Sequence, residues 1–142
     1  MHVERTFTVT REVEAVFDYL SDFTHTTEWD PGTVSTIRTS GDGGVGTTYD
    51  NTSRFMGRTV DLTYETVAHE RPSHVEFRGT TGSATTKDSM TFSRAGELTR
   101  VHYRADFDFG RLGNLVAPLL LRRKLDRLAD ETVAQLEKAL AG

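Results

Sequence analysis

Apolar residues recur along this chain with two different periods, and the period changes only a few times. Residues 2–10 alternate between apolar and polar side chains, which predicts a β-strand. Residues 12–22 carry apolar side chains at spacings of three or four, which predicts a helix with Thr10 as its N-cap. A second short helix is expected at residues 25–29, because a Pro-Gly pair follows soon after it.

The strand period returns at residue 33 and continues to residue 109, interrupted by turns. Six further strands are expected there, at residues 34–39, 45–55, 58–68, 73–80, 83–93 and 98–109. Their connections have the length of hairpin loops, so sequential strands should pair antiparallel. The glycine-rich stretch 41–46 is interpreted as a hairpin turn, because a strand follows it and it lacks the Gly-Lys-Ser/Thr ending of a phosphate loop.

The last part of the chain predicts one long helix, from Gly110 to Ala141. Its apolar stripe repeats every three or four residues and consists of Leu121, Leu125, Leu128, Thr132, Leu136 and Leu140. At about 1.5 Å per residue this helix is on the order of 45 Å long, so it needs a broad surface to cover the stripe. Its early part, residues 112–120, is apolar nearly all round and is interpreted as a movable lid and wall of a pocket. The whole pattern predicts a single α+β domain over residues 1–142, with a curved seven-stranded antiparallel sheet around the final helix.

The composition narrows the classes of function. The apolar fraction is 36%, which is low for a fully packed interior, so we expect a wet sheet face or an interior lined partly by polar groups. A formal net charge of −4 without a basic stripe argues against nucleic-acid binding. The chain has no cysteine, and no two histidines stand at metal-ligand spacing on one element, so no metal or disulfide is expected. Neither a signal peptide nor an apolar run of membrane-spanning length is visible, so we expect a cytoplasmic protein without stable membrane insertion.

The strand phases predict an inward sheet face that is mostly apolar but has polar exceptions. Asn51 and Asp88 fall mid-strand in phase with apolar residues, and burying either one without a partner costs roughly 1–3 kcal/mol or more. Tyr49, Tyr64 and Tyr103 each add a hydroxyl to an apolar body. This mixture is typical of a small-molecule cavity. Asp88 is the candidate general acid or base, since burial raises the pKa of a carboxyl; the alternatives are a position outside the sheet or a salt bridge to an arginine.

Five short pieces precede the final helix in a recognisable order. They are VTREVEAVFDYLSD at 9–22, WDP at 29–31, GDGGVGT at 41–47, ERP at 70–72 and LTRVHY at 98–103. In their order and spacing they resemble the SRPBCC superfamily of START-like, helix-grip proteins, which includes the polyketide cyclase/dehydrase and lipid-transport group and the birch-pollen-allergen family. The resemblance covers nearly the whole chain. It implies a helix-grip fold, with two short helices after the first strand and a deep cavity between the sheet and the final helix.

Two functions remain open at this point, and a third is weaker. The first is binding of a small hydrophobic or aromatic ligand, lipid-like or polyketide-like. The second is a cofactor-independent enzyme of the polyketide cyclase/dehydrase type, in which Tyr49, Asn51, Tyr64, Asp88 or Tyr103 transfers protons. The third is a protein-interaction role for the apolar start of the final helix. We favour binding because the sequence identifies no acid–base pair.

No cofactor is expected, and the protein is expected to be a monomer or a homodimer. Trp29 is interpreted either as a packing anchor or as part of the ligand wall. The residues predicted to line the ligand cavity are Trp29, Tyr49, Asn51, Phe55, Leu62, Tyr64, Phe77, Asp88, Met90, Tyr103, Phe107, Leu112, Val116 and Leu120.

Overall fold

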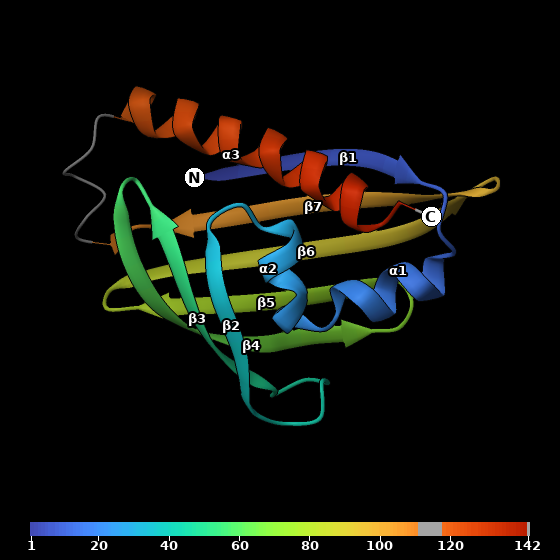
Figure 1. The fold of residues 1–142 in the computed structure, drawn as a ribbon, viewed down its shortest axis with the longest axis horizontal. Helices are drawn as coiled ribbons and strands as arrows, with labels where there is room; N and C mark the ends of the chain where they lie inside the picture. The colour runs from blue at the N-terminus through green and yellow to red at the C-terminus, as the bar shows by residue number, and fades with distance from the viewer. Residues whose placement is uncertain (111–117, 142) are drawn as a thin grey trace.

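The computed structural model describes residues 1–110 and 118–141, in which one seven-stranded antiparallel sheet is covered on one face by helices (Figure 1). The strands are β1 (His2–Val9), β2 (Thr33–Ser40), β3 (Thr48–Phe55), β4 (Arg58–Glu70), β5 (His74–Thr81), β6 (Ala84–Ala95) and β7 (Leu98–Asp108). The helices are α1 (Val13–Leu20), the 3₁₀ turn η1 (Phe23–His25), α2 (Thr26–Trp29) and α3 (Pro118–Ala139). The predicted α+β architecture and its order of elements are confirmed.

The sheet is a run of hairpins from β2 to β7, with β1 added beside β7. The spatial order is β1-β7-β6-β5-β4-β3-β2. In the β1–β7 pair, Val3 stands opposite Ala105 and Phe7 opposite Val101. A register shift after Thr66 marks a bulge in β4, which bends a strand and increases its twist. The sheet therefore has a concave face, and Figure 1 shows α3 along β1 while α1 and α2 lie against the same face.

The predicted phase of the strands is confirmed. On β6, the side chains of Asp88, Met90 and Phe92 are 8%, 0% and 3% exposed, whereas Lys87 and Thr91 are exposed. The strands from β3 to β7 and β1 follow the same phase, whereas β2, at the edge of the sheet, leaves Val34 and Ile37 exposed and buries Thr36. Since one face is buried, a slip of one residue would turn every apolar side chain towards water, so the register is strongly specified.

Aromatic packing fills one end of the concave face. The ring of Phe23 in η1 lies 4.3 Å from Tyr64, 4.5 Å from Phe77 and 5.6 Å from Tyr49, measured between ring centroids. Next to it, Phe17 of α1 meets Phe92 edge-on at 6.0 Å. Each such ring stabilises the fold by about 1.5–3 kcal/mol through burial. The short helices thus close this end, and the other end is left to α3.

The apolar stripe of α3 faces the sheet largely as predicted. The buried side chains follow one another at three or four residues and are Leu121, Leu125, Ala129, Thr132 and Leu136. Leu128 is only partly buried, and Ala129 takes its place in the stripe. The hydroxyl of Thr132 donates to the carbonyl of Leu128 at 2.8 Å, so this buried polar group is satisfied within the helix.

Two details of the helix ends differ from the prediction. Glu12, not Thr10, stands at the N-cap of α1, and its side chain makes no capping hydrogen bond. Gly110 has a φ of 56°, which a right-handed helix does not use, so the final helix cannot begin there. The first described residue of α3 is Pro118.

The predicted lid falls mostly beyond the described part of the chain. Residues 112–117 of that segment lie outside the described residues. Leu119 and Leu120, at its end, are 65% and 61% exposed. In the part that the structure describes, the surface of α3 that faces the sheet therefore comes from the turns after Leu120.

The ring of Tyr64 lies against a glycine on the neighbouring strand. Tyr64 and Gly79 are cross-strand partners. A Cβ at position 79 would stand 2.7 Å from two carbons of the Tyr64 ring and 2.8 Å from the methyl group of Thr86. Only glycine therefore leaves room for the ring in this position.

We predict that Gly79→Ala destabilises the protein by roughly 1–3 kcal/mol, the usual cost of overpacking. Within a strand, replacing glycine by alanine usually increases the free energy of unfolding, so a decrease here would be the reverse of the usual effect. Urea denaturation measures the change in the free energy of unfolding. In a Tyr64→Ala background the same substitution should cost less, because the ring is gone. An increase in stability from Gly79→Ala alone would contradict the described position of Tyr64.

Candidate functional site

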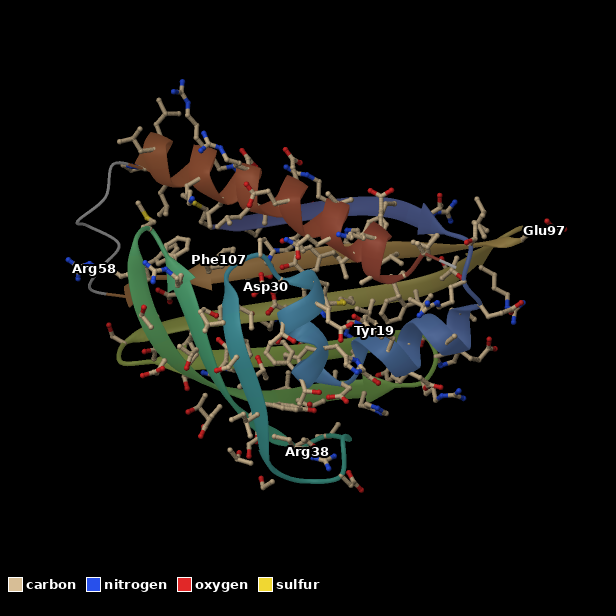
Figure 2. All side chains as sticks on the ribbon, viewed as in Figure 1. Tyr19, Asp30, Arg38, Arg58, Glu97 and Phe107 are labelled. Atoms are coloured by element: carbon tan, nitrogen blue, oxygen red, sulfur yellow. The ribbon has the colours of Figure 1, made fainter. Side chains whose placement is uncertain are left out.

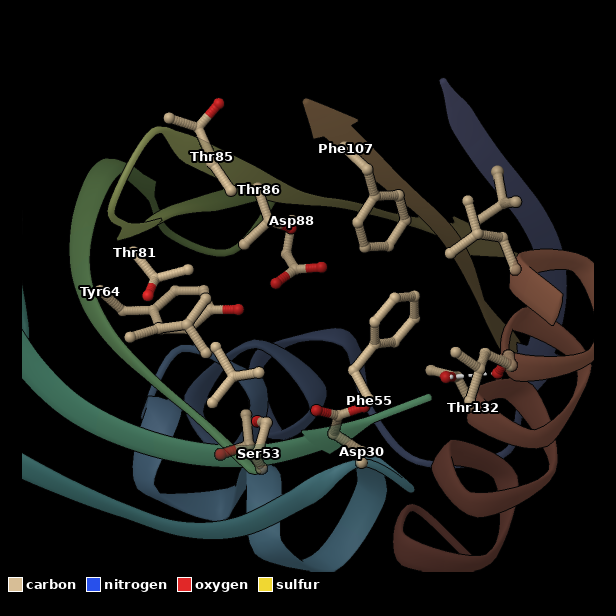
Figure 3. A pocket seen from close by; sticks show the side chains of 18 of the residues that line it. Asp30, Ser53, Phe55, Tyr64, Thr81, Thr85, Thr86, Asp88, Phe107 and Thr132 are labelled. Carbon is tan, nitrogen blue, oxygen red and sulfur yellow. Dashed lines mark hydrogen bonds between the residues drawn. The ribbon is translucent and has the colours of Figure 1, made fainter. Parts of the chain in front are cut away.

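A cavity of about 230 Å³ lies between the concave face of the sheet, α2 and the middle turns of α3 (Figure 3). Most of its wall is apolar or aromatic, and its polar groups come from several different strands. The lining residues are Val3, Phe23, Thr26, Trp29, Asp30, Gly32, Ser53, Arg54, Phe55, Val60, Leu62, Tyr64, Thr81, Ala84, Thr85, Thr86, Asp88, Tyr103, Phe107, Asp108, Phe109, Leu125, Leu128, Ala129 and Thr132.

Three phenylalanine rings form a stacked row along the wall. The ring of Phe109 lies 5.8 Å from that of Phe107, with an angle of 5° between the planes. It also lies 5.8 Å from the ring of Phe55, at 20°. Phe55 ends β3 and Phe107 stands near the end of β7, so the row joins two strands that are far apart in the sheet. It gives the cavity a continuous apolar surface there.

Asp88 places a carboxyl on the wall of this cavity. It is 8% exposed, and its Oδ1 accepts a hydrogen bond from the hydroxyl of Tyr103 at 3.1 Å. Burial, followed by the charge of Asp30 and that of Asp106, raises the pKa of Asp88 to about 7; the Tyr103 hydrogen bond acts in the opposite direction. Asp88 is therefore close to half-protonated at neutral pH, as a general acid or base requires.

Asp30 supplies a second carboxyl, at the end of α2. Its Oδ2 accepts a hydrogen bond from the hydroxyl of Thr33 at 2.6 Å. Burial raises the pKa of Asp30, while hydrogen bonds from Thr33 and the backbone of Gly32 lower it. In Figure 3, Asp30 and Asp88 project into the cavity from opposite sides, and the Tyr64 hydroxyl points into the space beside them.

Two tyrosines complete the polar part of the wall. Burial, and next the charge of Asp88, raise the pKa values of both Tyr64 and Tyr103 well above the ordinary value. Both hydroxyls therefore stay protonated and are hydrogen-bond donors at neutral pH. The cavity thus combines two carboxyls and two phenols on an apolar wall, which is an arrangement able to donate, accept or transfer protons.

The structure brings half of the predicted site residues to the cavity and leaves the others elsewhere. Those that line it are Trp29, Phe55, Leu62, Tyr64, Asp88, Tyr103 and Phe107. Those that are buried but do not line it are Tyr49, Asn51, Phe77 and Met90. Leu120 is 61% exposed, and Leu112 and Val116 lie outside the described residues.

Elements η1 and β2 cover three of the predicted residues that are buried away from the cavity, Tyr49, Phe77 and Asn51. The ring of Phe23, which itself lines the cavity, packs on those of Tyr49 and Phe77, which do not. The amide of Asn51 donates to the Thr36 hydroxyl at 2.8 Å and accepts from Ser53 at 2.6 Å. The polar exception on β3 is therefore satisfied by neighbouring side chains and needs neither water nor ligand.

Several lining residues were not predicted. Asp30 lies in the WDP piece noted in the sequence, but a carboxyl at the end of a helix belongs to no apolar period. Leu125 and Thr132 were assigned to packing on the sheet, and they also form part of the cavity wall. A polar residue in an apolar helical stripe, such as Thr132, was the available signal for this.

A metal centre finds no support. The described residues contain no group of three or more His, Cys, Asp or Glu side chains able to hold a metal ion. Among the same residues, no helix is long and apolar enough to cross a membrane.

Comparison with known proteins gives the same fold and a family. The sequence profile described as polyketide cyclase / dehydrase and lipid transport matches residues 1–141. A search of curated proteins finds no match.

Three solved structures illustrate the similarity of fold. TTHA0849 from Thermus thermophilus is 17% identical and has a TM-score of 0.79, with 99% of this chain and 97% of that chain covered. A START superfamily protein from Mycobacterium smegmatis is 13% identical, with a TM-score of 0.79 over 98% of this chain and 96% of that chain. The Zhui aromatase/cyclase from Streptomyces sp. R1128 is 16% identical, with a TM-score of 0.73 over 99% of this chain and 90% of that chain.

We predict that Asp88→Asn stabilises the protein at neutral pH and removes part of its pH dependence. The carboxyl has a pKa near 3.9 when unfolded and about 7 when folded. As the pH rises from about 4 to about 7, the unfolded state loses its proton first, so the wild-type free energy of unfolding falls; at 1.36 kcal/mol per pKa unit the total is on the order of 4 kcal/mol. Above about pH 7 the difference is constant.

Urea denaturation of both proteins between pH 4 and pH 8 checks this. Asp106→Asn is the control, because hydrogen bonds from Arg104 lower the pKa of Asp106, so its neutralisation should destabilise at pH 7. Parallel pH curves for wild type and Asp88→Asn would show that Asp88 has an ordinary pKa.

Proposed function

Because the chain belongs to the polyketide cyclase/dehydrase and lipid-transport family, we propose that it binds a small, mainly apolar ligand in the cavity between the sheet and α3. The observation that carries this proposal is the cavity itself, an apolar and aromatic wall with a few converging polar groups. That combination is the usual character of a small-molecule site. Binding is the function favoured from the sequence as well.

The size of the cavity limits the ligand. Its volume, about 230 Å³, lies below the range of ~300–1,000 Å³ common for drug-sized ligands. We infer a compact ligand of one or two rings rather than a long acyl chain. The predicted site residues at the cavity, from Trp29 to Phe107, would contact it directly.

We predict that a compact aromatic compound raises the unfolding temperature, and that Leu62→Trp abolishes this effect by filling the cavity. A ligand at 100 times its dissociation constant stabilises the native state by about 2.7 kcal/mol. Thermal shift against a panel of small apolar and aromatic compounds measures it. Leu98→Trp is the matched control, because Leu98 is 39% exposed and does not line the cavity. Failure of the whole panel, or an unchanged response in Leu62→Trp, would contradict binding at this place.

A second candidate function is catalysis of the cyclase/dehydrase type. It is favoured by Asp88, whose pKa of about 7 suits proton transfer at neutral pH, and by its hydrogen bond from Tyr103. In such a reaction the Asp88 carboxylate would take a proton from a methylene group between two carbonyls. The carbanion formed would attack another carbonyl carbon of the substrate. The protonated Asp88 would then return its proton to that carbonyl's oxygen, to which the Tyr64 hydroxyl would donate a hydrogen bond. Tyr49 and Asn51 have no part in this version, because they do not line the cavity.

The two functions are separated by one substitution. If the protein is an enzyme, Asp88→Asn lowers kcat by about 10²- to 10⁴-fold and leaves the affinity for a neutral apolar ligand within a few-fold of wild type. Asp18→Asn is the control and should keep full turnover, because Asp18 is exposed and does not line the cavity. Unchanged turnover in Asp88→Asn would remove Asp88 from the mechanism while leaving the binding function intact.

A further inference from the structure

We propose that the ligand carries a protonated amine on its compact apolar body, and that the amine is held between the carboxyls of Asp30 and Asp88. This inference rests on the proposed binding function and names the chemical class of the ligand. It starts from the two carboxyls that face one cavity, as Figure 3 shows.

Neither carboxyl has a cation beside it among the described residues. Two arginines form ion pairs with other aspartates, Arg71 with Asp18 and Arg104 with Asp106. The partners of Asp88 and Asp30 are hydroxyl and backbone groups, from Tyr103 in one case and from Thr33 and Gly32 in the other. A buried carboxylate without an opposite charge is costly, and here each one also repels the other.

The rest of the described cavity wall does not compensate these charges. The charged residues of the whole wall are three aspartates, Asp30, Asp88 and Asp108, and one arginine, Arg54. Arg54 is exposed. Figure 2 shows that many charged side chains project outward from the ribbon. When these carboxyls are ionised, the described residues offer them no cation, and a cationic ligand would supply it. An anionic ligand would instead add a further negative charge.

A second observation, independent of the carboxyls, also indicates a missing ligand group. Trp29 lines the cavity and is 2% exposed, and its indole N–H has no hydrogen-bond partner among the described residues. The ring lies 6.3 Å from that of Tyr103, edge to face. A buried polar group is normally paired, so we expect the bound molecule to carry a hydrogen-bond acceptor for this N–H in addition to its amine, because an ammonium group has only donors. The same aromatic rings favour a cation by interaction with their faces.

An ammonium group fits this place better than a hydroxyl does. It has three N–H donors, so it can donate to more than one carboxyl oxygen, and its charge is opposite to that of the ionised carboxyls. A neutral alcohol donates one hydrogen bond and leaves the repulsion unchanged.

The test compares three probes of nearly equal size: 2-phenylethylamine, 2-phenylethanol and 3-phenylpropanoate. At pH 8, titration calorimetry should give the amine roughly 10- to 100-fold tighter binding than the alcohol, and the carboxylate the weakest. In Asp30→Asn and in Asp88→Asn the preference for the amine should fall to a few-fold or less. Asp18→Asn is the matched control and should keep it, because Asp18 is exposed, pairs with Arg71 and does not line the cavity.

The pH dependence gives a second reading. The groups that face Asp88 are Asp30 from α2, Tyr64 from β4 and Tyr103 from β7, with Asp106 acting at longer range from β7. Because the amine binds the ionised carboxyl, its affinity should rise by up to about tenfold per pH unit below pH 7 and level off above it. Asp88→Asn should remove this slope, and 2-phenylethanol should not show it.

The outcomes separate this inference from the proposed function. If the alcohol binds as tightly as the amine, or if the amine binds equally well to the Asp→Asn variants, the ligand class is wrong and cavity binding stands. If none of the three probes binds, and the wider panel also fails, both proposals are overturned.

Discussion

The carboxyl of Asp88 stands on the concave face of the sheet, where burial and the charge of Asp30 both oppose its ionisation. Its ionised form is costly to bury without an opposite charge, and the side chain faces the open cavity. The hydrogen bond from Tyr103 fixes the carboxyl in place but supplies no charge. Any ligand of this cavity therefore lies beside a carboxyl that has no cationic partner among the described residues.

The helices divide the concave face into a core and a cavity. At one end, Phe17 and Phe23 pack on aromatic residues of the sheet and form a core, whose inner edge at Phe23 borders the cavity. At the other end, α3 crosses the sheet with Ala129 and Thr132 in its buried stripe. Short side chains there cannot reach the strands, so the space between them remains open. The same long helix thus holds the fold together and forms one wall of the site.

The period of the sequence predicted the strands and their phase, and this placed both polar exceptions on the correct face. The period could not predict which part of each strand a helix covers and which part faces the cavity. Asn51 and Asp88 were equivalent on that basis, yet Asn51 is satisfied by Thr36 and Ser53 and Asp88 faces the cavity. Asp30 was missed because it follows a four-residue helix, where no period exists to give a direction. Those contacts depend on tertiary packing, which local patterns do not encode.

Binding and catalysis make the same demand on this site, a carboxyl that changes its charge near neutral pH. The most direct measurement is therefore a titration of the Asp88 carboxyl carbon by NMR, assigned by comparison with Asp88→Asn. The structure predicts a midpoint near 7, and a downward shift when 2-phenylethylamine is bound. A midpoint near the ordinary value of about 3.9 would contradict the account, since Asp88 would then be solvated or paired and the cavity would lose its chemical character.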